Sequence, residues 1–273
     1  MMEKRVEVTI EAGVADVRLV RADKMNALDA AMFEALVSTG QRLQEEPGLR
    51  AVVLSGEGRA FCAGLDMGRF QKMADAPSDN VGGLSHEMRL GTRTHGISNA
   101  AQYAVMVWRE LPVPVIAAVH GVALGGGFQL MLGADMRFVA PDTRLSVLEI
   151  KWGLVPDMGG MALMRELARG DVIRDLTYSG RMFDGTEALT LGFATRVCSD
   201  PLAEARAYAR DIAGKSPQAI RAAKRLFAMS ATADIASILM AESTEQIALM
   251  GRPNQVEAVS AGLQKRAPNF IDV

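Results

Sequence analysis

The chain has 273 residues, of which 49% are hydrophobic and 23% are charged, and its formal net charge is -2. Such values indicate a globular protein with one large domain, or one domain and a smaller appendage, and they do not favour a nucleic-acid partner. The only two cysteines, Cys62 and Cys198, have no CxxC spacing, which argues against a disulfide framework or a structural zinc site. No signal-peptide pattern opens the chain and no apolar run is long enough for a membrane span, so we expect a cytoplasmic protein.

The first 200 residues alternate between strand and helix patterns. Asp29 can cap a helix that runs to about Glu46, with apolar side chains at helical spacing. Short apolar runs bounded by turn residues predict strands at 5–10, 14–20, 51–56, 115–121 and 136–141. This alternation is typical of an α/β fold, in which helices cover a parallel sheet.

The pattern changes near residue 200. Four helical segments punctuated by glycine or proline follow, at 201–214, 216–230, 232–251 and 252–267. We therefore predict a core at residues 1–200 and an all-helical C-terminal region at 201–273. Residues 71–99 carry several glycines and few large apolar groups, which predicts a mobile loop before a helix ending near Trp108. This loop either borders a functional site or is a plain surface insertion.

Three adjacent glycines, Gly125 to Gly127, follow a predicted strand and open a predicted helix. The first turn of a helix leaves N–H groups without intrahelical partners, and glycine lets a ligand approach them closely. Phosphate binding and oxyanion stabilisation both use such groups. The phosphate fingerprints GxxxxGK[ST] and GxGxxG are absent, and tight packing between strand and helix is the structural alternative. A second turn, Ala63-Gly64, also follows a strand and offers a further backbone donor.

Two carboxylates, Glu149 and Asp157, stand in a mostly apolar stretch. Partial burial would raise their pKa values and suit them to proton transfer. An ordinary ion pair, for example of Glu149 with Lys151 or Arg144, is the alternative. His86, His95 and His120 show no metal-ligand spacing, so no metal site is predicted. His120, beside a turn glycine, is interpreted as a hydrogen-bonded residue at a strand end. The GxSxG motif typical of a nucleophilic serine is absent.

Four stretches together resemble the crotonase superfamily, which contains the enoyl-CoA hydratases and isomerases. They are DKMNALD (23–29), FCAGLDMG (61–68), HGVALGGGFQLMLGADMRF (120–138) and EIKWGLVPDMGG (149–160). The resemblance covers nearly the whole chain. It implies a crotonase-like spiral of ββα units, a helical C-terminal trimerisation region, and assembly as a homotrimer or a hexamer. It also implies an acyl-CoA thioester as substrate, with coenzyme A as part of that substrate and no separate cofactor.

The same resemblance assigns roles to individual residues. The backbone N–H groups of Ala63 and Gly126 would form an oxyanion hole for the thioester oxygen, where two fixed donors stabilise a developing enolate. The residues implied to bind coenzyme A are Lys24, Met25, Ala27, the run Ala63 to Asp66 with Gly64 and Leu65, and Lys265 near the C-terminus.

The acid–base groups depart from the hydratase pattern. Hydratases of the family use two glutamates, and here the first of these positions holds Gln129, an amide that cannot exchange a proton at neutral pH. Glu149 remains at the second position. Asp157, eight residues later, matches the spacing of dienoyl-CoA isomerases, which also tend to keep an acid where Gln129 stands. The hypothesis is double-bond isomerisation by a shuttle in which Glu149 is the base and Asp157 its partner.

Several other functions stay open at this point. An enoyl-CoA hydratase of fatty-acid β-oxidation, a thioesterase-like hydrolase and a C–C lyase would all use the same oxyanion hole. An acyl-CoA-binding protein with little activity would fit the loss of one glutamate. RNA binding, which a few members show through a lysine-rich first helix, is disfavoured because the segment 29–46 carries only Arg42 as a basic residue.

Overall fold

The computed structural model describes residues 4–68 and 90–272. A six-stranded sheet lies at its centre, with the strand order β1-β2-β3-β4-β6-β8. The first pair is antiparallel, with Val6 opposite Leu19, and every later pair is parallel. The strands span Val6–Glu11, Val14–Leu19, Ala51–Gly56, Val115–Val119, Met136–Val139 and Arg196–Val197. The predicted strands and the parallel α/β arrangement are confirmed.

Helices cover both faces of this sheet. On one face lie α1 (Ala30–Gln44), α3 (Ala100–Glu110) and α4 (Gly126–Leu132), which share the larger apolar core with Val52 and Leu54 of β3. On the other face lies α8 (Pro201–Ala213), whose Ala205 and Ala209 pack with Ala51 and Val53 of the same strand. Because successive side chains of a strand point to opposite faces, β3 is buried along its whole length.

A small second sheet carries the connections that matter for the site. Strand β5 (Val122–Leu124) pairs in parallel with β7 (Arg144–Ser146). Helix α4 begins directly after β5, and a 3-10 helix, η4 (Glu149–Trp152), follows β7. The short helices α5 (Gly160–Met164), α6 (Gly170–Ser179) and α7 (Gly185–Leu191) then lead back to β8. Position 129 on α4 and position 149 at the start of η4 are thereby placed beside each other.

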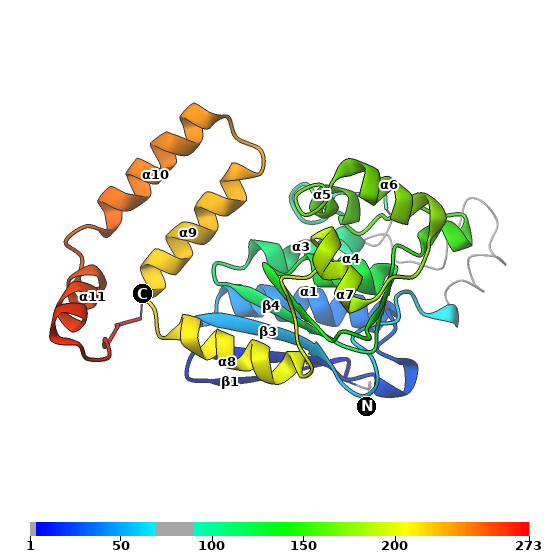
Figure 1. Cartoon of the computed structure of the whole chain (residues 1–273), viewed down its shortest axis with the longest axis horizontal. Helices are drawn as coiled ribbons and strands as arrows, with labels where there is room; N and C mark the ends of the chain where they lie inside the picture. Colours follow the sequence, from blue (N-terminus) through cyan, green and yellow to red (C-terminus); the bar gives the residue numbers. More distant parts are fainter. Residues whose placement is uncertain (1–3, 69–89, 273) are drawn as a thin grey trace.

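The C-terminal helices extend away from the sheet (Figure 1). They are α9 (Pro217–Ser230), α10 (Ile235–Leu249) and α11 (Pro253–Gln264). The predicted change to an all-helical region at residue 201 is confirmed. Its first helix, α8, belongs spatially to the sheet, so only α9 to α11, called the arm below, leave the core.

Local residues explain several of the boundaries. The side chain of Asp29 accepts a hydrogen bond from the N–H of Met32 and caps α1, as predicted, and α1 ends at Gln44, two residues before the expected end. Asn99 and Gln102 form a capping box at the start of α3. Of the loop predicted at 71–99, residues 71–89 lie outside the described residues, and residues 90–99 form turns before α3.

Candidate active site

The two glycine-bearing turns of the sequence analysis meet in the structure. The N–H of Cys62 donates to the carbonyl of Val122 at 3.1 Å, and the N–H of Leu124 donates to the carbonyl of Cys62 at 3.1 Å. A side chain on Gly127 would collide with the Cys62 carbonyl, and a Cβ on Gly64 would lie 3.5 Å from the Gly126 nitrogen. The glycines therefore allow the backbones of two turns to touch, which the sequence alone does not reveal.

Gly126 is the first residue of α4, so its N–H has no partner within the helix. Gly125 precedes it with φ 51° and ψ -116°, a conformation that a residue with a side chain rarely adopts. A Cβ on Gly126 would lie 2.9 Å from both Leu28 Cδ1 and Met158 Sδ. The Cα of Gly126 thus lies against two apolar side chains, and the residue is buried, so a hydrogen bond from its amide to a negatively charged oxygen is stronger than in water.

The second predicted donor, the N–H of Ala63, has a different partner. It donates to the carbonyl of Met25 at 2.9 Å. Met25 and the next residue, Asn26, both have positive φ values, 50° and 56°, so the chain turns sharply here. The Met25 carbonyl therefore occupies the position from which a substrate oxygen would contact Ala63.

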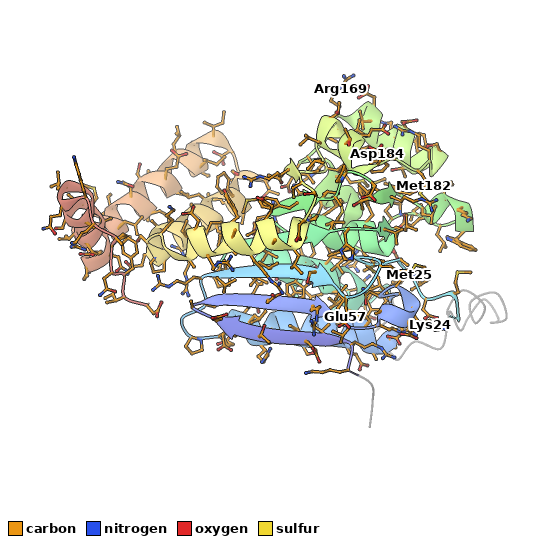
Figure 2. The ribbon with its side chains drawn as sticks, turned by 60° about the horizontal axis from the view of Figure 1, so that its bottom comes forward. Lys24, Met25, Glu57, Arg169, Met182 and Asp184 are labelled. Atoms are coloured by element: carbon orange, nitrogen blue, oxygen red, sulfur yellow. The ribbon has the colours of Figure 1, made fainter. Side chains whose placement is uncertain are left out.

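A single buried side chain ties this sharp turn to its neighbour. Asn26 accepts the N–H of Arg21 at 2.9 Å and donates to the carbonyls of Glu57 at 3.0 Å and Ala60 at 2.8 Å. Figure 2 shows Lys24, Met25 and Glu57 at the same end of the molecule. The sequence analysis did not give Asn26 this role, although an asparagine inside a short turn segment is a recognised signal of such side-chain bonding.

The residues implied to bind coenzyme A are adjacent, with one exception. The N–H of Leu28 donates to the Gly64 carbonyl at 2.8 Å, next to Ala27 and Leu65. Arg21, to which the sequence analysis gave no role, donates to the Asp66 carboxylate at 2.6 Å and to the Ala27 carbonyl at 3.0 Å. Arg21 and Asp29 lie on either side of this turn, so an ionic network supports it.

Lys265 is the exception. It directly follows α11 with φ 54°, and α11 lies at the end of the molecule opposite to α5 and α6 (Figure 1). The structure therefore does not bring Lys265 to the turns of the same chain.

Gln129 and Glu149 are in direct contact. The Gln129 amide nitrogen Nε2 donates to Glu149 Oε1 at 2.6 Å. The described residues form neither of the ion pairs considered in the sequence analysis, Glu149 with Lys151 or Glu149 with Arg144. The second oxygen, Oε2, is buried and has no hydrogen-bond partner among the described residues.

The surroundings of Glu149 favour its protonated form. Burial raises its pKa above the ordinary value of 4.5, and the negative charge of Asp157 raises it further. The N–H groups of Glu149 and Leu148 and the Gln129 amide oppose this shift. Asp157 is exposed as a residue, but desolvation of its carboxyl group raises the pKa above the ordinary value of 3.8. Both carboxyl groups therefore keep a proton to higher pH than an ordinary carboxyl group does, as is typical of groups that transfer protons.

Two residues next to these turns, Cys62 and His120, make structural contacts. Cys62 lies beside Gly127, but burial raises the pKa of its thiol to about 12, so the thiol stays protonated. His120 shares a hydrogen bond with the Gly58 carbonyl at 2.9 Å, as expected for a strand-end residue. His86 lies outside the described residues. Within the described ranges, no three His, Cys, Asp or Glu side chains converge to hold a metal ion.

The sequence model of the enoyl-CoA hydratase/isomerase family matches residues 9–272. The chain belongs to this family. Its resemblance to the crotonase superfamily is confirmed. Among the described residues, no helix is long and apolar enough to cross a membrane.

Individual relatives cover nearly the whole chain. The mitochondrial Delta(3,5)-Delta(2,4)-dienoyl-CoA isomerase of Rattus norvegicus is 30% identical over 94% of this chain and 79% of its own length. A probable enoyl-CoA hydratase of Mycobacterium tuberculosis is also 30% identical, over 94% of both chains. A crystal structure of an enoyl-CoA hydratase from Mycobacterium smegmatis has a TM-score of 0.82 and 32% identity, and covers 98% of this chain and 99% of that one. The crotonase-like fold is thus confirmed.

Proposed function

We propose that this chain catalyses the migration of a double bond in an enoyl-CoA or dienoyl-CoA thioester. The observation that carries the proposal is that the side chains at positions 129, 149 and 157 differ in their ability to exchange protons. Gln129 can neither give nor take a proton, whereas Glu149 and Asp157 both have raised pKa values. The dienoyl-CoA isomerase of Rattus norvegicus is a relative at 30% identity, in accord with this choice.

The proposed reaction moves one proton off the acyl chain and another onto it. Glu149, ionised, takes a proton from the carbon next to the thioester carbonyl, and the electron pair of the broken C–H bond passes into the carbonyl as a dienolate. Asp157, protonated, gives its proton to the far carbon of the conjugated chain. Glu149 ends protonated and Asp157 ends ionised, and water returns a proton from Glu149 to Asp157. The product therefore has the same composition as the substrate, and no cofactor is required.

The oxyanion hole and the coenzyme A site complete the proposal. The Gly126 N–H stabilises the dienolate oxygen, and the Ala63 N–H joins it when that oxygen replaces the Met25 carbonyl. Lys24, Met25, Ala27, Gly64, Leu65 and Asp66 lie together and would hold coenzyme A. Lys265 would act only from another copy of the chain, in the homotrimer or hexamer that we propose.

The test compares two substrates. We expect a 3,5-dienoyl-CoA to be converted to a conjugated product of unchanged mass, faster than a trans-2-enoyl-CoA gains the mass of one water molecule. Faster hydration would contradict the isomerase proposal. It would favour the second candidate, an enoyl-CoA hydratase, which the Mycobacterium tuberculosis relative supports at the same identity. Tight binding of both thioesters without turnover would instead indicate an acyl-CoA-binding protein.

A further inference from the structure

The amide of Gln129 has only one possible orientation. Only 1% of this residue is exposed, and its Oε1 accepts two backbone hydrogen bonds, from the N–H of Met158 at 2.8 Å and of Gly160 at 3.0 Å. A flipped amide would place its NH₂ group against these two N–H donors, and its oxygen against the Glu149 carboxylate. The network of donors and acceptors therefore fixes which end of the amide faces Glu149.

The turn that supplies these donors is shaped around the amide. A Cβ on Gly160 would lie 2.6 Å from Gln129 Oε1, so any larger residue would push the amide away. Gly159, directly before it, has φ 87°, which brings the N–H of Gly160 toward the site. The backbone of this turn therefore holds the Gln129 side chain in place. Its two N–H donors require a side-chain oxygen at position 129 that accepts their hydrogen bonds.

The opposite end of the amide acts on a single atom of Glu149. Nε2 donates to Oε1 at 2.6 Å, whereas Oε2 is buried and has no partner among the described residues. One oxygen of the carboxylate is therefore held and the other is left to react.

We propose that Gln129 is a positioning residue that holds Glu149 by Oε1 and leaves Oε2 as the one atom of this carboxylate that exchanges protons with the substrate. The proposal rests on the proposed function in that Glu149 is taken as the base. It gives a reason for an amide, in place of an acid, at position 129. An amide donates to Glu149 at every pH, whereas a carboxylate would add a second negative charge at hydrogen-bond distance.

The groups around Gln129 and Glu149 determine how a substitution at position 129 would change the protonation of Glu149. Asp157, when ionised, raises the pKa of Glu149, whereas the Gln129 amide and the N–H groups of Glu149 and Leu148 lower it. In a Gln129→Glu variant, the N–H groups of Met158 and Gly160 would favour the negative charge on the new side chain. The proton shared by the two carboxyl groups would then reside on Glu149, which could act as a base only at higher pH than in the wild type.

The kinetic test uses two variants and a control. In Gln129→Met, which removes the donor, we expect kcat for double-bond migration to fall by about 10²-fold because the base is misplaced, with little change in KM. The acid limb of the pH profile should move to higher pH, and it should move further in Gln129→Glu. Gln102→Glu makes the same amide-to-carboxylate exchange at the capping box of α3, and should leave both kcat and the profile unchanged.

A second measurement does not depend on activity. Infrared spectra recorded across a pH titration follow the carboxyl band of Glu149, which Glu149→Gln assigns by its disappearance. We expect the titration of this band at higher pH in Gln129→Met and Gln129→Glu than in the wild type. Equal titration midpoints in all three proteins would overturn the inference. If the wild type shows no isomerisation at all, the proposed function fails, whereas this titration still decides the role of Gln129.

Discussion

Strand β3 and helix α10 bury their apolar side chains very differently. Every residue of β3 is buried, because helices cover both faces of the sheet. Helix α10 has no buried residue and exposes large apolar side chains on several sides. These are Ile235, Leu239, Met240 and Ile247, which are 76%, 56%, 69% and 72% exposed. The core buries its own apolar side chains, whereas the arm exposes an apolar surface of the kind that mediates association between proteins.

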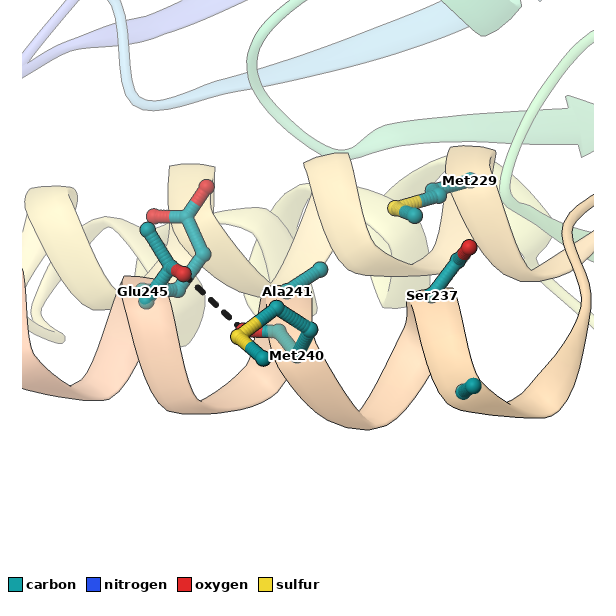
Figure 3. A pocket seen from close by; sticks show the side chains of 7 residues that line it. Met229, Ser237, Met240, Ala241 and Glu245 are labelled. Atoms are coloured by element: carbon teal, nitrogen blue, oxygen red, sulfur yellow. Dashed lines mark hydrogen bonds between the residues drawn. The ribbon is translucent and has the colours of Figure 1, made fainter.

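The residues with proposed functional roles also divide between the core and the arm. The proposed catalytic and oxyanion residues lie in the core, whereas Lys265 directly follows α11 of the arm, which extends away from the sheet. A hollow of about 570 Å³ lies between α9 and α10, lined by Met229, Ser237 and Met240 among others (Figure 3), and it contains none of the proposed catalytic residues. The comparison therefore predicts that core substitutions change chemistry, and that arm substitutions change assembly.

The largest effect is expected in the core. Glu149→Gln should lower the rate of double-bond migration by roughly 10²–10⁴-fold, the usual contribution of a positioned acid or base. The fold should remain, because the amide can still accept the hydrogen bond of Gln129. Circular dichroism checks the fold and a continuous absorbance assay checks the rate. Full activity in this variant would remove Glu149 from the mechanism.

In the arm, charges on the apolar surface should act on assembly alone. The double variant Ile247→Glu and Leu263→Glu changes side chains that are 72% and 81% exposed, so the fold of one chain should survive. We expect light scattering to give a trimer or hexamer for the wild type and a monomer for the variant. Ile97→Glu, at an 87% exposed apolar residue outside the arm, is the control and should keep the wild-type mass. An unchanged mass in the double variant would contradict the assembly proposal.

A buried lysine of α9 connects the arm to the core. Lys224 of α9 is 91% buried as a side chain and donates to Asp135 at 2.8 Å and to the Val113 carbonyl at 2.7 Å. Lys224→Met should lower the free energy of unfolding by about 2–3 kcal/mol, since it leaves Asp135 and the carbonyl without this partner.

The neighbouring residue of α9 provides the control. Arg225 pairs with Glu245 of α10, but 59% of its side chain is exposed. Arg225→Met should cost less than about 1 kcal/mol. Urea unfolding of both variants measures the difference, and equal losses would mean that burial does not distinguish the two pairs.

The smallest effect expected is a pH dependence of stability. Because the folded-state pKa of Glu149 is raised above 4.5, the folded state keeps this proton to higher pH than the unfolded state does. Glu149 therefore destabilises the fold progressively as the pH rises from 4.5 through the raised pKa, and it has no such effect below 4.5. The wild type should lose stability relative to Glu149→Gln over this window, by roughly 2–4 °C in Tm per kcal/mol. A Tm difference that does not change with pH would contradict this expectation.

The sequence predicts the core well because its signals are local. Asp29 lies directly before a helical pattern, β3 is a continuous apolar run, and the C-terminal helices are separated by Gly and Pro. The site is predicted only in part because it depends on contacts between distant turns. The bonds from Gln129 to Met158 and Gly160 span about thirty residues, and Asn26 bonds across a similar distance to Ala60. No periodicity in the sequence encodes such contacts.

The central proposal is that Glu149 takes the first proton and Asp157 delivers the second. Hydrogen exchange on the substrate tests this proposal most directly. A 3,5-dienoyl-CoA is incubated in D₂O with the wild type, Glu149→Gln and Asp157→Asn, and NMR follows the hydrogens next to the thioester carbonyl. We predict that Asp157→Asn still exchanges these hydrogens for deuterium while double-bond migration is lost. Glu149→Gln should lose both. Exchange that persists in Glu149→Gln and disappears in Asp157→Asn would contradict the account by reversing the two roles.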